Sequence, residues 1–335
     1  MKRILFLCLV LISLLVASGC RANSEAETPP EQPPVHLTGL PRLYVSAMYT
    51  DKVVAIDLEN YEVLAEQGVG EAPYGLALDR AGNQLLVACS LSSEIWCLDL
   101  TTLEKKAVIP VDRWPAYIAV DEEAREAYAG NSGSDTISVI DLDTYREIAR
   151  VKVGKTPVNV QVLPERRLAV TLHDEGMLAL MDLENLQVVS RHPIAGKAAG
   201  LAWDGRQELL YTGGHGWQED NNIVRIHPLA NLEGPGQIET PLMPIYLQLT
   251  PDGSKLMTLH HRLNQLFVTD VTTGQVLGEM NTGKTPFSTA LWDEGRMAAV
   301  ANMDSNEVQI VDLEHFDTLK FIKVLEGPAG MAVLD

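Results

Sequence analysis

Three histidines recur at nearly equal intervals through the middle of the chain. His173, His215 and His260 are separated by 42 and 45 residues. Imidazole nitrogens bind zinc, copper, iron and nickel, and three converging rings would form a transition-metal site with one open ligand position. The same rings could instead line a pocket for an organic ligand, or hydrogen-bond the backbone of their own loops. We predict that the three histidines share one site, as a metal centre or as a pocket, and the interpretation in which each ring serves its own loop stays open as the alternative.

Other polar side chains fall at the same interval. Asn131 lies 42 residues before His173, Asn302 lies 42 residues after His260, and Trp217 follows His215 closely. We therefore expect Asn131, Asn302 and Trp217 to line the same site as the histidines. His215 keeps this spacing when its repeat is counted from Ala199, and it shifts by one residue when the count starts at Tyr211.

Basic side chains recur at a second position, with Arg113, Lys155 and Lys197 spaced 42 residues apart on an otherwise acidic chain. One interpretation is a sector that attracts an anionic ligand beside the histidines. The other is that Gly154-Lys-Thr-Pro157 is a favoured turn sequence and its lysine is solvated. On the first interpretation, Lys155 and Lys197 belong to the ligand site.

The elements that must position these residues follow from a repeat of about 42 residues. Each copy contains four short segments in which apolar residues alternate with period two, which indicates strands rather than helices. Seven copies of such a unit predict a seven-bladed β-propeller, an all-β fold with four-stranded blades. The proline position of the repeat is occupied by Pro73, Pro115, Pro157, Ala199, Pro244, Pro286 and Pro328. The aspartate position is occupied by Asp57, Asp99, Asp141, Asp182, His227, Asp270 and Asp312.

The two ends of the array predict how the ring closes. The first copy begins at Arg42-Leu-Tyr-Val45, which matches the second strand of the later copies, and the last copy is only an opening strand, Pro328 to Leu334. Joining the two fragments makes one composite blade and removes two exposed sheet edges. The propeller therefore spans residues 42–335.

The blades carry a family resemblance. Leu43-Tyr-Val-Ser-Ala47, Val53-Val-Ala-Ile-Asp57 and Gly283-Lys-Thr-Pro286 resemble the YVTN family of bacterial β-propeller repeats over residues 42–335. The resemblance implies an exported propeller, of a kind that serves as a binding scaffold, a surface-layer component, a lactonase-like or lyase-like enzyme or an oxidoreductase subunit. The copy that begins at Ala199 departs most, because it has His227 at the aspartate position and an insertion at 213–222.

The amino-terminal segment has the features of an export signal. Lys2 and Arg3 precede an apolar run, and Ala17-Ser-Gly19 precedes Cys20. This arrangement resembles a bacterial lipoprotein box, which implies removal of residues 1–19 and lipid on Cys20. The alternatives are secretion without lipid and a segment that is retained as a membrane anchor. Residues 20–41 are rich in proline and acidic side chains, which predicts an extended tether between the membrane and the propeller.

Charge and cysteine content limit the partners. Without Lys2 and Arg3, 24 basic and 45 acidic side chains remain, a net charge of −21. Such a surface argues against nucleic acid as a partner and leaves the lipid anchor as the only expected contact with a membrane. Cys89 and Cys97 lie in one hairpin but out of register, so we expect free thiols. We also expect a monomer.

Two classes of function remain. The chain contains none of the local catalytic, phosphate-binding or haem-attachment motifs. We expect a binding or interaction module that takes a small-molecule or protein ligand on its loop-rich face, at the mouth of the central channel. The alternative is an exported hydrolase, lyase or oxidoreductase that uses His173, His215 and His260, with zinc or copper as a possible cofactor.

Overall fold

The computed structural model of the chain describes residues 36–37, 39–194, 196–215, 221–233 and 236–335, and for His215 only the backbone. The expected signal peptide, Cys20, most of the expected tether and Trp217 lie outside these residues. The described part of the chain contains no helix that is long and apolar enough to cross a membrane.

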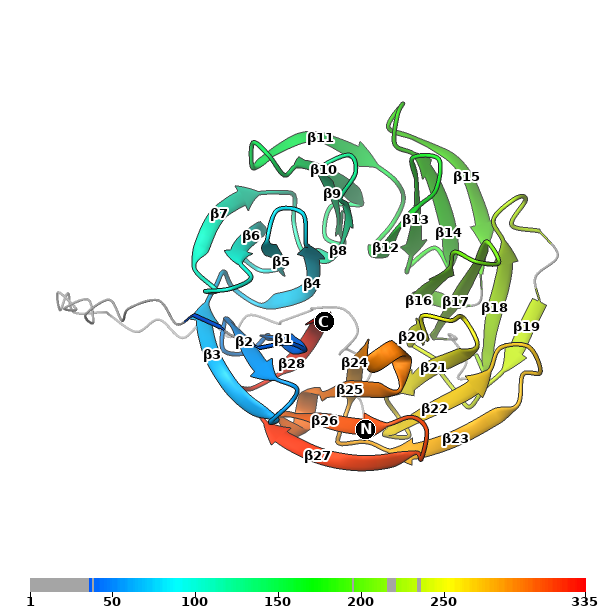
Figure 1. Ribbon diagram of the computed structural model, residues 1–335. Helices are drawn as coiled ribbons and strands as arrows, with labels where there is room; N and C mark the ends of the chain where they lie inside the picture. The colour runs from blue at the N-terminus through cyan, green and yellow to red at the C-terminus, as the bar shows by residue number, and fades with distance from the viewer. Residues whose placement is uncertain (1–35, 38, 195, 216–220, 234–235) are drawn as a thin grey trace, which may run out of the picture. The chain divides into compact units, whose positions relative to one another are not determined.

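Seven four-stranded antiparallel sheets are arranged as blades around a central axis (Figure 1), which confirms the predicted all-β seven-bladed propeller. We number the blades in chain order from the composite blade. The first blade contains β28 (Pro328–Leu334), β1 (Arg42–Ala47), β2 (Lys52–Asp57) and β3 (Glu62–Gly68). The second contains β4 (Pro73–Asp79), β5 (Gln84–Cys89), β6 (Glu94–Asp99) and β7 (Lys105–Pro110). The third contains β8 (Pro115–Asp121), β9 (Glu126–Asn131), β10 (Thr136–Asp141) and β11 (Arg146–Lys152).

The remaining blades follow the same order, with the first strand of each nearest the axis (Figure 1). The fourth contains β12 (Pro157–Leu163), β13 (Arg167–Leu172), β14 (Met177–Asp182) and β15 (Gln187–Pro193). The fifth contains β16 (Lys197–Asp204), β17 (Leu209–His215), β18 (Ile223–Pro228) and β19 (Gly236–Glu239). The sixth contains β20 (Tyr246–Leu249), β21 (Lys255–His260), β22 (Gln265–Asp270) and β23 (Val276–Asn281). The seventh contains β24 (Pro286–Trp292), β25 (Met297–Asn302), β26 (Glu307–Asp312) and β27 (Asp317–Lys323), with single 3₁₀ turns η1 (Asp293–Gly295) and η2 (Met303–Ser305).

The ring closes through the composite blade, as predicted. β28 pairs antiparallel with β1, with Arg42 opposite Leu334. The hydroxyl of Ser46 donates to the carbonyl oxygen of Tyr74 at 2.7 Å and accepts from the N–H of Gly330 at 2.8 Å. A Cβ atom on Gly330 would lie 2.1 Å from the Tyr74 oxygen, so only glycine lets β28 approach β4 this closely. The junction therefore depends on small and polar residues.

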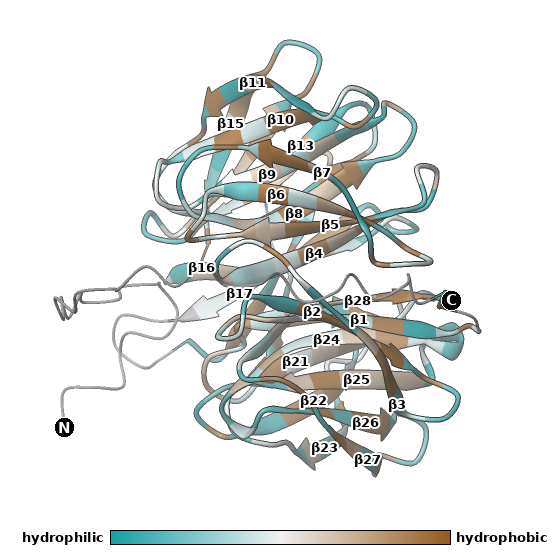
Figure 2. Ribbon diagram, turned by 90° about the vertical axis from the view of Figure 1, so that its left-hand side faces the viewer, coloured by the Kyte–Doolittle hydropathy of each residue, from teal (hydrophilic) through white to brown (hydrophobic). Residues whose placement is uncertain are grey.

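The core is divided among the contacts between blades. Seven apolar clusters of buried residues each join two neighbouring blades. In one of them Tyr44 and Val53 of the first blade pack against Leu85 and Leu98 of the second. Figure 2 shows hydrophobic segments concentrated in the strands and hydrophilic ones in the connecting turns. Because each fully buried large apolar side chain contributes about 1.5–3 kcal/mol, the blades are stabilised chiefly by each other.

The repeated aspartate stabilises the turn between the third and fourth strands. Asp57 accepts hydrogen bonds from the backbone N–H groups of Glu59 and Asn60 at 2.7 and 3.3 Å. A carboxylate in this place fixes the turn by satisfying its donors. In the fifth blade His227 is instead buried, with Nε2 2.9 Å from the hydroxyl of Thr212, and it joins two strands. The departure at His227 thus has a structural role.

The end of the predicted tether is part of the folded unit. Leu37 is 6% exposed, and its N–H donates to the carbonyl oxygen of Thr101 at 2.7 Å. Arg42 is buried, and its guanidinium donates to the carbonyl oxygens of Gly39 and Leu100. The tether was expected to contain little that could be buried, and Leu37 is an exception because the second blade offers it an apolar contact and a carbonyl acceptor.

Cys89 and Cys97 are free thiols, as predicted. Cys89 lies opposite Glu94 and Cys97 opposite Leu86, so the register keeps the two sulfur atoms apart. Burial raises the pKa of both thiols, which leaves them protonated and unreactive at neutral pH.

Candidate functional site in the central channel

Three residues predicted for the site share one register position at the end of the second strand of their blades. Asn131, His260 and Asn302 are all fully buried. The carboxamide of Asn131 donates to the hydroxyl of Ser138 at 2.8 Å, and that of Asn302 donates to the side chain of Gln309 at 3.4 Å. These side chains hydrogen-bond within their own blades, so the position has a structural role.

His173 does not hold this position. The turn between β12 and β13 has three residues, 164–166, whereas the matching turn of the second blade has four, 80–83. Leu172 is therefore the last paired residue of β13, and His173 follows it. By the same count, the position is held by Gly214 in the fifth blade and by His260 in the sixth. His215 and His261 each come one residue after it.

The structurally equivalent histidines of the fourth to sixth blades are thus His173, His215 and His261. The predicted alignment of His260 with His173 and His215 is wrong, because one residue is missing from a turn of the fourth blade.

The ring of His260 is fully engaged by the protein. Its Nδ1 lies 2.9 Å from the carbonyl oxygen of Leu242, its Nε2 lies 2.8 Å from the hydroxyl of Thr258, and it packs edge-on against Phe267. His173 is also buried, with Nδ1 3.0 Å from a carboxylate oxygen of Asp174. Within the described residues, no group of three or more His, Cys, Asp or Glu side chains could hold a metal ion. His260 has no ring nitrogen left for zinc or copper.

The Gly-Lys-Thr-Pro turn is held by its threonine. Thr156 has a left-handed backbone (φ 53°), and its hydroxyl donates to Asp174 at 2.8 Å. Lys155 is exposed, and Lys197 lies 3.5 Å from the same carboxylate of Asp174. The turn before the seventh blade repeats the arrangement, with the hydroxyl of Thr285 2.6 Å from Asp304. This geometry explains, without a ligand, why Gly-Lys-Thr-Pro recurs before the fourth and seventh blades.

An apolar cluster joins the first, second and seventh blades at the loop face, the end of the axis where the inner strands begin. Met303, Phe287 and Ala329 are buried there, and Tyr74 packs against them. The Tyr74 ring stands edge-on to Phe287 and to Tyr117, with centroids 5.2 and 5.3 Å away. This packing reduces the room for a ligand at the loop face on that side of the ring.

A cavity of about 500 Å³ lies further along the axis, among the third to sixth blades. It is within the range of about 300–1,000 Å³ that is typical of small-molecule sites. We call it the channel cavity. Its lining residues are Tyr117, Asn159, Gln161, Leu201, Ala202, Trp203, Asp204, Gly205, Arg206, Tyr246, Leu247, Gln248, Leu249, Thr250, Pro251 and Gly253.

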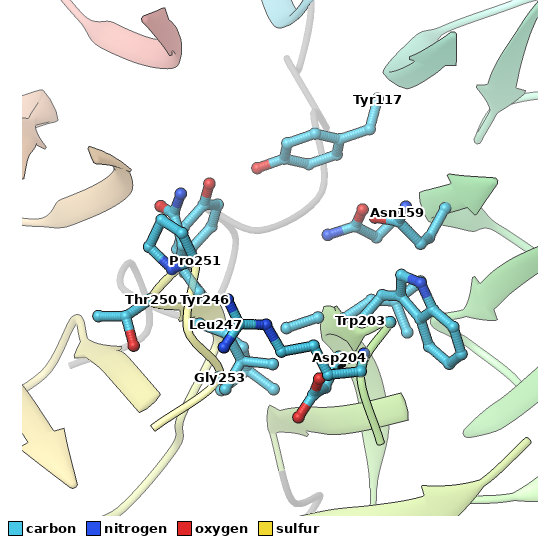
Figure 3. A pocket seen from close by; sticks show the side chains of 16 residues that line it. Tyr117, Asn159, Trp203, Asp204, Tyr246, Leu247, Thr250, Pro251 and Gly253 are labelled. Atoms are coloured by element: carbon cyan, nitrogen blue, oxygen red, sulfur yellow. Dashed lines mark hydrogen bonds between the residues drawn. The ribbon is translucent and has the colours of Figure 1, made fainter. Parts of the chain in front are cut away.

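β-Bulges direct two of these side chains inward. The pairing of β8 with β9 shifts between Pro115 and Ile118, and Tyr117 lies inside the shift. β12 shifts in the same way around Asn159. Bulges re-aim side chains and are common beside functional sites. Figure 3 shows the Tyr117 hydroxyl and the Asn159 carboxamide pointing into the same hollow.

Hydrogen bonds orient the other polar groups of the lining. The oxygen of Gln248 accepts from the Thr289 hydroxyl at 2.6 Å, which leaves the NH₂ group of Gln248 as a donor. The NH₂ group of Gln161 donates to the carbonyl oxygen of Val162 at 2.9 Å, which leaves the Gln161 oxygen as an acceptor. The lining therefore offers both donors and acceptors.

The two charged residues of the lining are hydrogen-bonded to turns, Asp204 to its own and Arg206 to that of the next blade. Asp204 is 4% exposed and accepts from the N–H groups of Arg206 and Gln207 and from the Gln207 side chain. Arg206 is exposed at the rim and donates to the carbonyl oxygen of Asp252 at 3.1 Å. The Tyr246 hydroxyl donates to Thr289, and burial raises the pKa of Tyr246 to about 12. No acid–base pair is poised in this lining.

The channel cavity reaches the surface at the end of the axis opposite the predicted site. Its rim is formed by the exposed residues Gly205, Arg206 and Pro251, which follow the inner strands β16 and β20. His260 ends β21, which runs antiparallel to β20, and so lies toward the other end. Of the eight residues predicted for the site, the six whose side chains the structure describes do not line the cavity, while Trp217 and the side chain of His215 lie outside the described part of the chain. The predicted ligand site on the loop face stays a prediction, and the channel cavity opens at the other end of the axis.

A sequence signal for the cavity was present but is easily overlooked. Asn159 and Gln161 alternate with valines in β12, and Gln248 lies between leucines in β20. The matching strand of the first blade has Gly330 and Ala332 at these positions. Carboxamides in the innermost strand of a blade indicate a polar lining of the channel.

Solved structures share this architecture at low sequence identity. Hydrazine synthase of Kuenenia stuttgartiensis is similar over 89% of this chain and 100% of that one, with 18% identity and a TM-score of 0.73. A functionally unknown protein of Desulfotomaculum acetoxidans matches 88% and 99% of the two chains, with 10% identity and a TM-score of 0.76. Dihydro-heme d1 dehydrogenase NirN, solved in complex with DHE, matches 91% and 83%, with 14% identity and a TM-score of 0.63.

These similarities establish the fold alone. No family model matches the sequence, and no curated protein matches it either. The resemblance to YVTN repeats is thus confirmed as far as the seven-bladed propeller and its repeats, and no further.

Proposed function

We propose that the chain is an exported, lipid-anchored propeller that acts as a binding module, and that its ligand is a small molecule held in the channel cavity. The observation that supports this most is a hollow of about 500 Å³ lined by aromatic and carboxamide side chains from four blades. Two β-bulges direct side chains into it. The enzyme alternative has no comparable support, because His260 is fully hydrogen-bonded and Asp204 is committed to its turn.

The test is a thermal-shift screen of the mature chain against sugars, amino acids, nucleosides and small carboxylic acids. A ligand at about 100 times its dissociation constant stabilises the folded state by about 2.7 kcal/mol, which raises the melting temperature measurably. We expect at least one compound to do so. The same compound should have little or no effect on Asn159→Trp, which places an indole in the channel cavity and takes up part of its volume.

The variant should fold, because Tyr117 and Tyr246 already place aromatic rings at the matching positions of β8 and β20. Val189→Trp is the matched control, since Val189 is 57% exposed on the outer strand β15. It should respond to the compound as the wild-type protein does. A compound that stabilises Asn159→Trp equally would place binding elsewhere and contradict the proposal, as would a screen without any stabilising compound.

A further inference from the structure

We infer that the ligand of the channel cavity is an uncharged saccharide, an inference that rests on the binding function proposed above. Three properties of the lining support it. The lining has aromatic surfaces, its carboxamides offer both donors and acceptors, and its charged groups are hydrogen-bonded to turns.

The aromatic surfaces come from three blades. Tyr117, Trp203 and Tyr246 all line the cavity and are all partly exposed. Trp203 packs on one side against the core between the fourth and fifth blades, which holds the indole in place. The face of an aromatic ring is electronegative, so it attracts the weakly positive C–H groups of a pyranose ring. A rigid indole also loses little conformational freedom when a ligand stacks on it.

The carboxamides match the hydroxyl groups of a sugar. A hydroxyl both donates and accepts, so it pairs with either end of a carboxamide. Gln248 presents a donor, Gln161 presents an acceptor, and Asn159 presents both. A purely apolar ligand would leave these partly buried groups unpaired, at about 1–3 kcal/mol each. The lining therefore selects a ligand with many hydroxyl groups.

The electrostatics of the cavity disfavour charged ligands. Asp204 is buried, and three hydrogen bonds from its own turn occupy most of its acceptor positions, so a cation would have to displace them to bind it. Arg206 is at the exposed rim and donates to the carbonyl oxygen of Asp252. An anionic group taken into the interior would lose hydration without gaining a positive counter-charge there. Among polar ligands, the cavity therefore favours neutral ones.

The inference is tested by isothermal titration of the mature chain with maltose, cellobiose, lactose and chitobiose. Gluconate, glucose 6-phosphate and spermidine serve as charged comparisons. We expect one or more neutral disaccharides to bind and the charged compounds not to bind. Asn159→Leu should weaken binding roughly ten-fold, the effect of losing one or two hydrogen bonds. Asn281→Leu, at an exposed position on the outer strand β23, should bind like the wild-type protein.

The outcomes separate this inference from the proposed function. Binding of a neutral saccharide that is weakened by Asn159→Leu but not by Asn281→Leu supports the inference. If the thermal-shift screen finds compounds of another class that Asn159→Trp blocks, the saccharide inference is overturned and the binding function stands. If nothing in the screen stabilises the wild-type protein, both are overturned.

Discussion

At the scale of single residues, His260 illustrates a histidine that serves folding. Burial lowers its pKa, because a charged ring loses hydration there, although the hydrogen bond to Leu242 opposes the shift. A depressed pKa means that the unfolded chain binds the proton more readily. The contribution of His260 to the free energy of unfolding is therefore complete above the pKa of the unfolded state, about 6.5, and is lost as the pH falls below that value.

His260→Asn should reduce the loss of stability between pH 7 and pH 5, because Asn131 and Asn302 already fill this register position in other blades. Each pKa unit that separates the folded and unfolded states contributes about 1.4 kcal/mol. The measurement is the melting temperature against pH. His315→Asn is a control of opposite sign, because Asp312 raises the pKa of the exposed His315. Identical pH profiles for His260→Asn and the wild-type protein would contradict this account.

Whether a site residue could be predicted from the sequence depended on its place in the fold. The histidines attracted attention because residues in loops and at strand ends stand out from the alternating pattern. Asn159 and Gln161 are inside a strand, and Asn159 lies within a bulge that the sequence does not mark. A turn one residue shorter than its counterparts was enough to misplace His173 by one position.

At the scale of elements, the closing strand β28 depends on a close approach. A methyl group at residue 330 would lie 2.1 Å from the carbonyl oxygen of Tyr74, so Gly330→Ala must push β28 away from β4 and weaken the hydrogen bond to Ser46. Overpacking of this kind typically costs about 1–3 kcal/mol. Urea denaturation should show this loss. Gly68→Ala is the control, since nothing lies within 4 Å of its added Cβ, and equal stability of the two variants would rule the argument out.

Strand order and closure were predictable because proline, aspartate and alternating apolar residues repeat with the blades. Pro73 and Pro115 begin inner strands, and Asp57 ends a third strand. The fifth blade was harder to predict. There the buried His227 replaces the aspartate that marks the end of the third strand in the other blades. The outer strand β19 also starts only after a longer connection.

At the scale of the whole molecule, the chain enters the propeller at the same end of the ring as the rim of the channel cavity. Arg42, where the chain enters, lies opposite Leu334 at the end of the inner strand β28. The rim residues Gly205 and Arg206 follow the end of the inner strand β16. Inner strands run in one direction along the axis, so both features are on the face away from the Gly-Lys-Thr-Pro turns.

We predict that the protein is attached to a membrane through Cys20. Cys20 follows Ala17-Ser-Gly19 and should be the lipidated first residue of the mature chain. With a net charge of −21 after removal of residues 1–19, the chain as a whole is repelled by anionic lipid. A single acyl chain gives only marginal binding, so we expect at least two on the Cys20 peptide. Mass spectrometry of the membrane fraction measures this directly. Cys20→Ser should move the protein out of that fraction, whereas Ser24→Ala, in the tether, should leave it there; a wild-type product that is cut elsewhere and carries no lipid would refute the anchor.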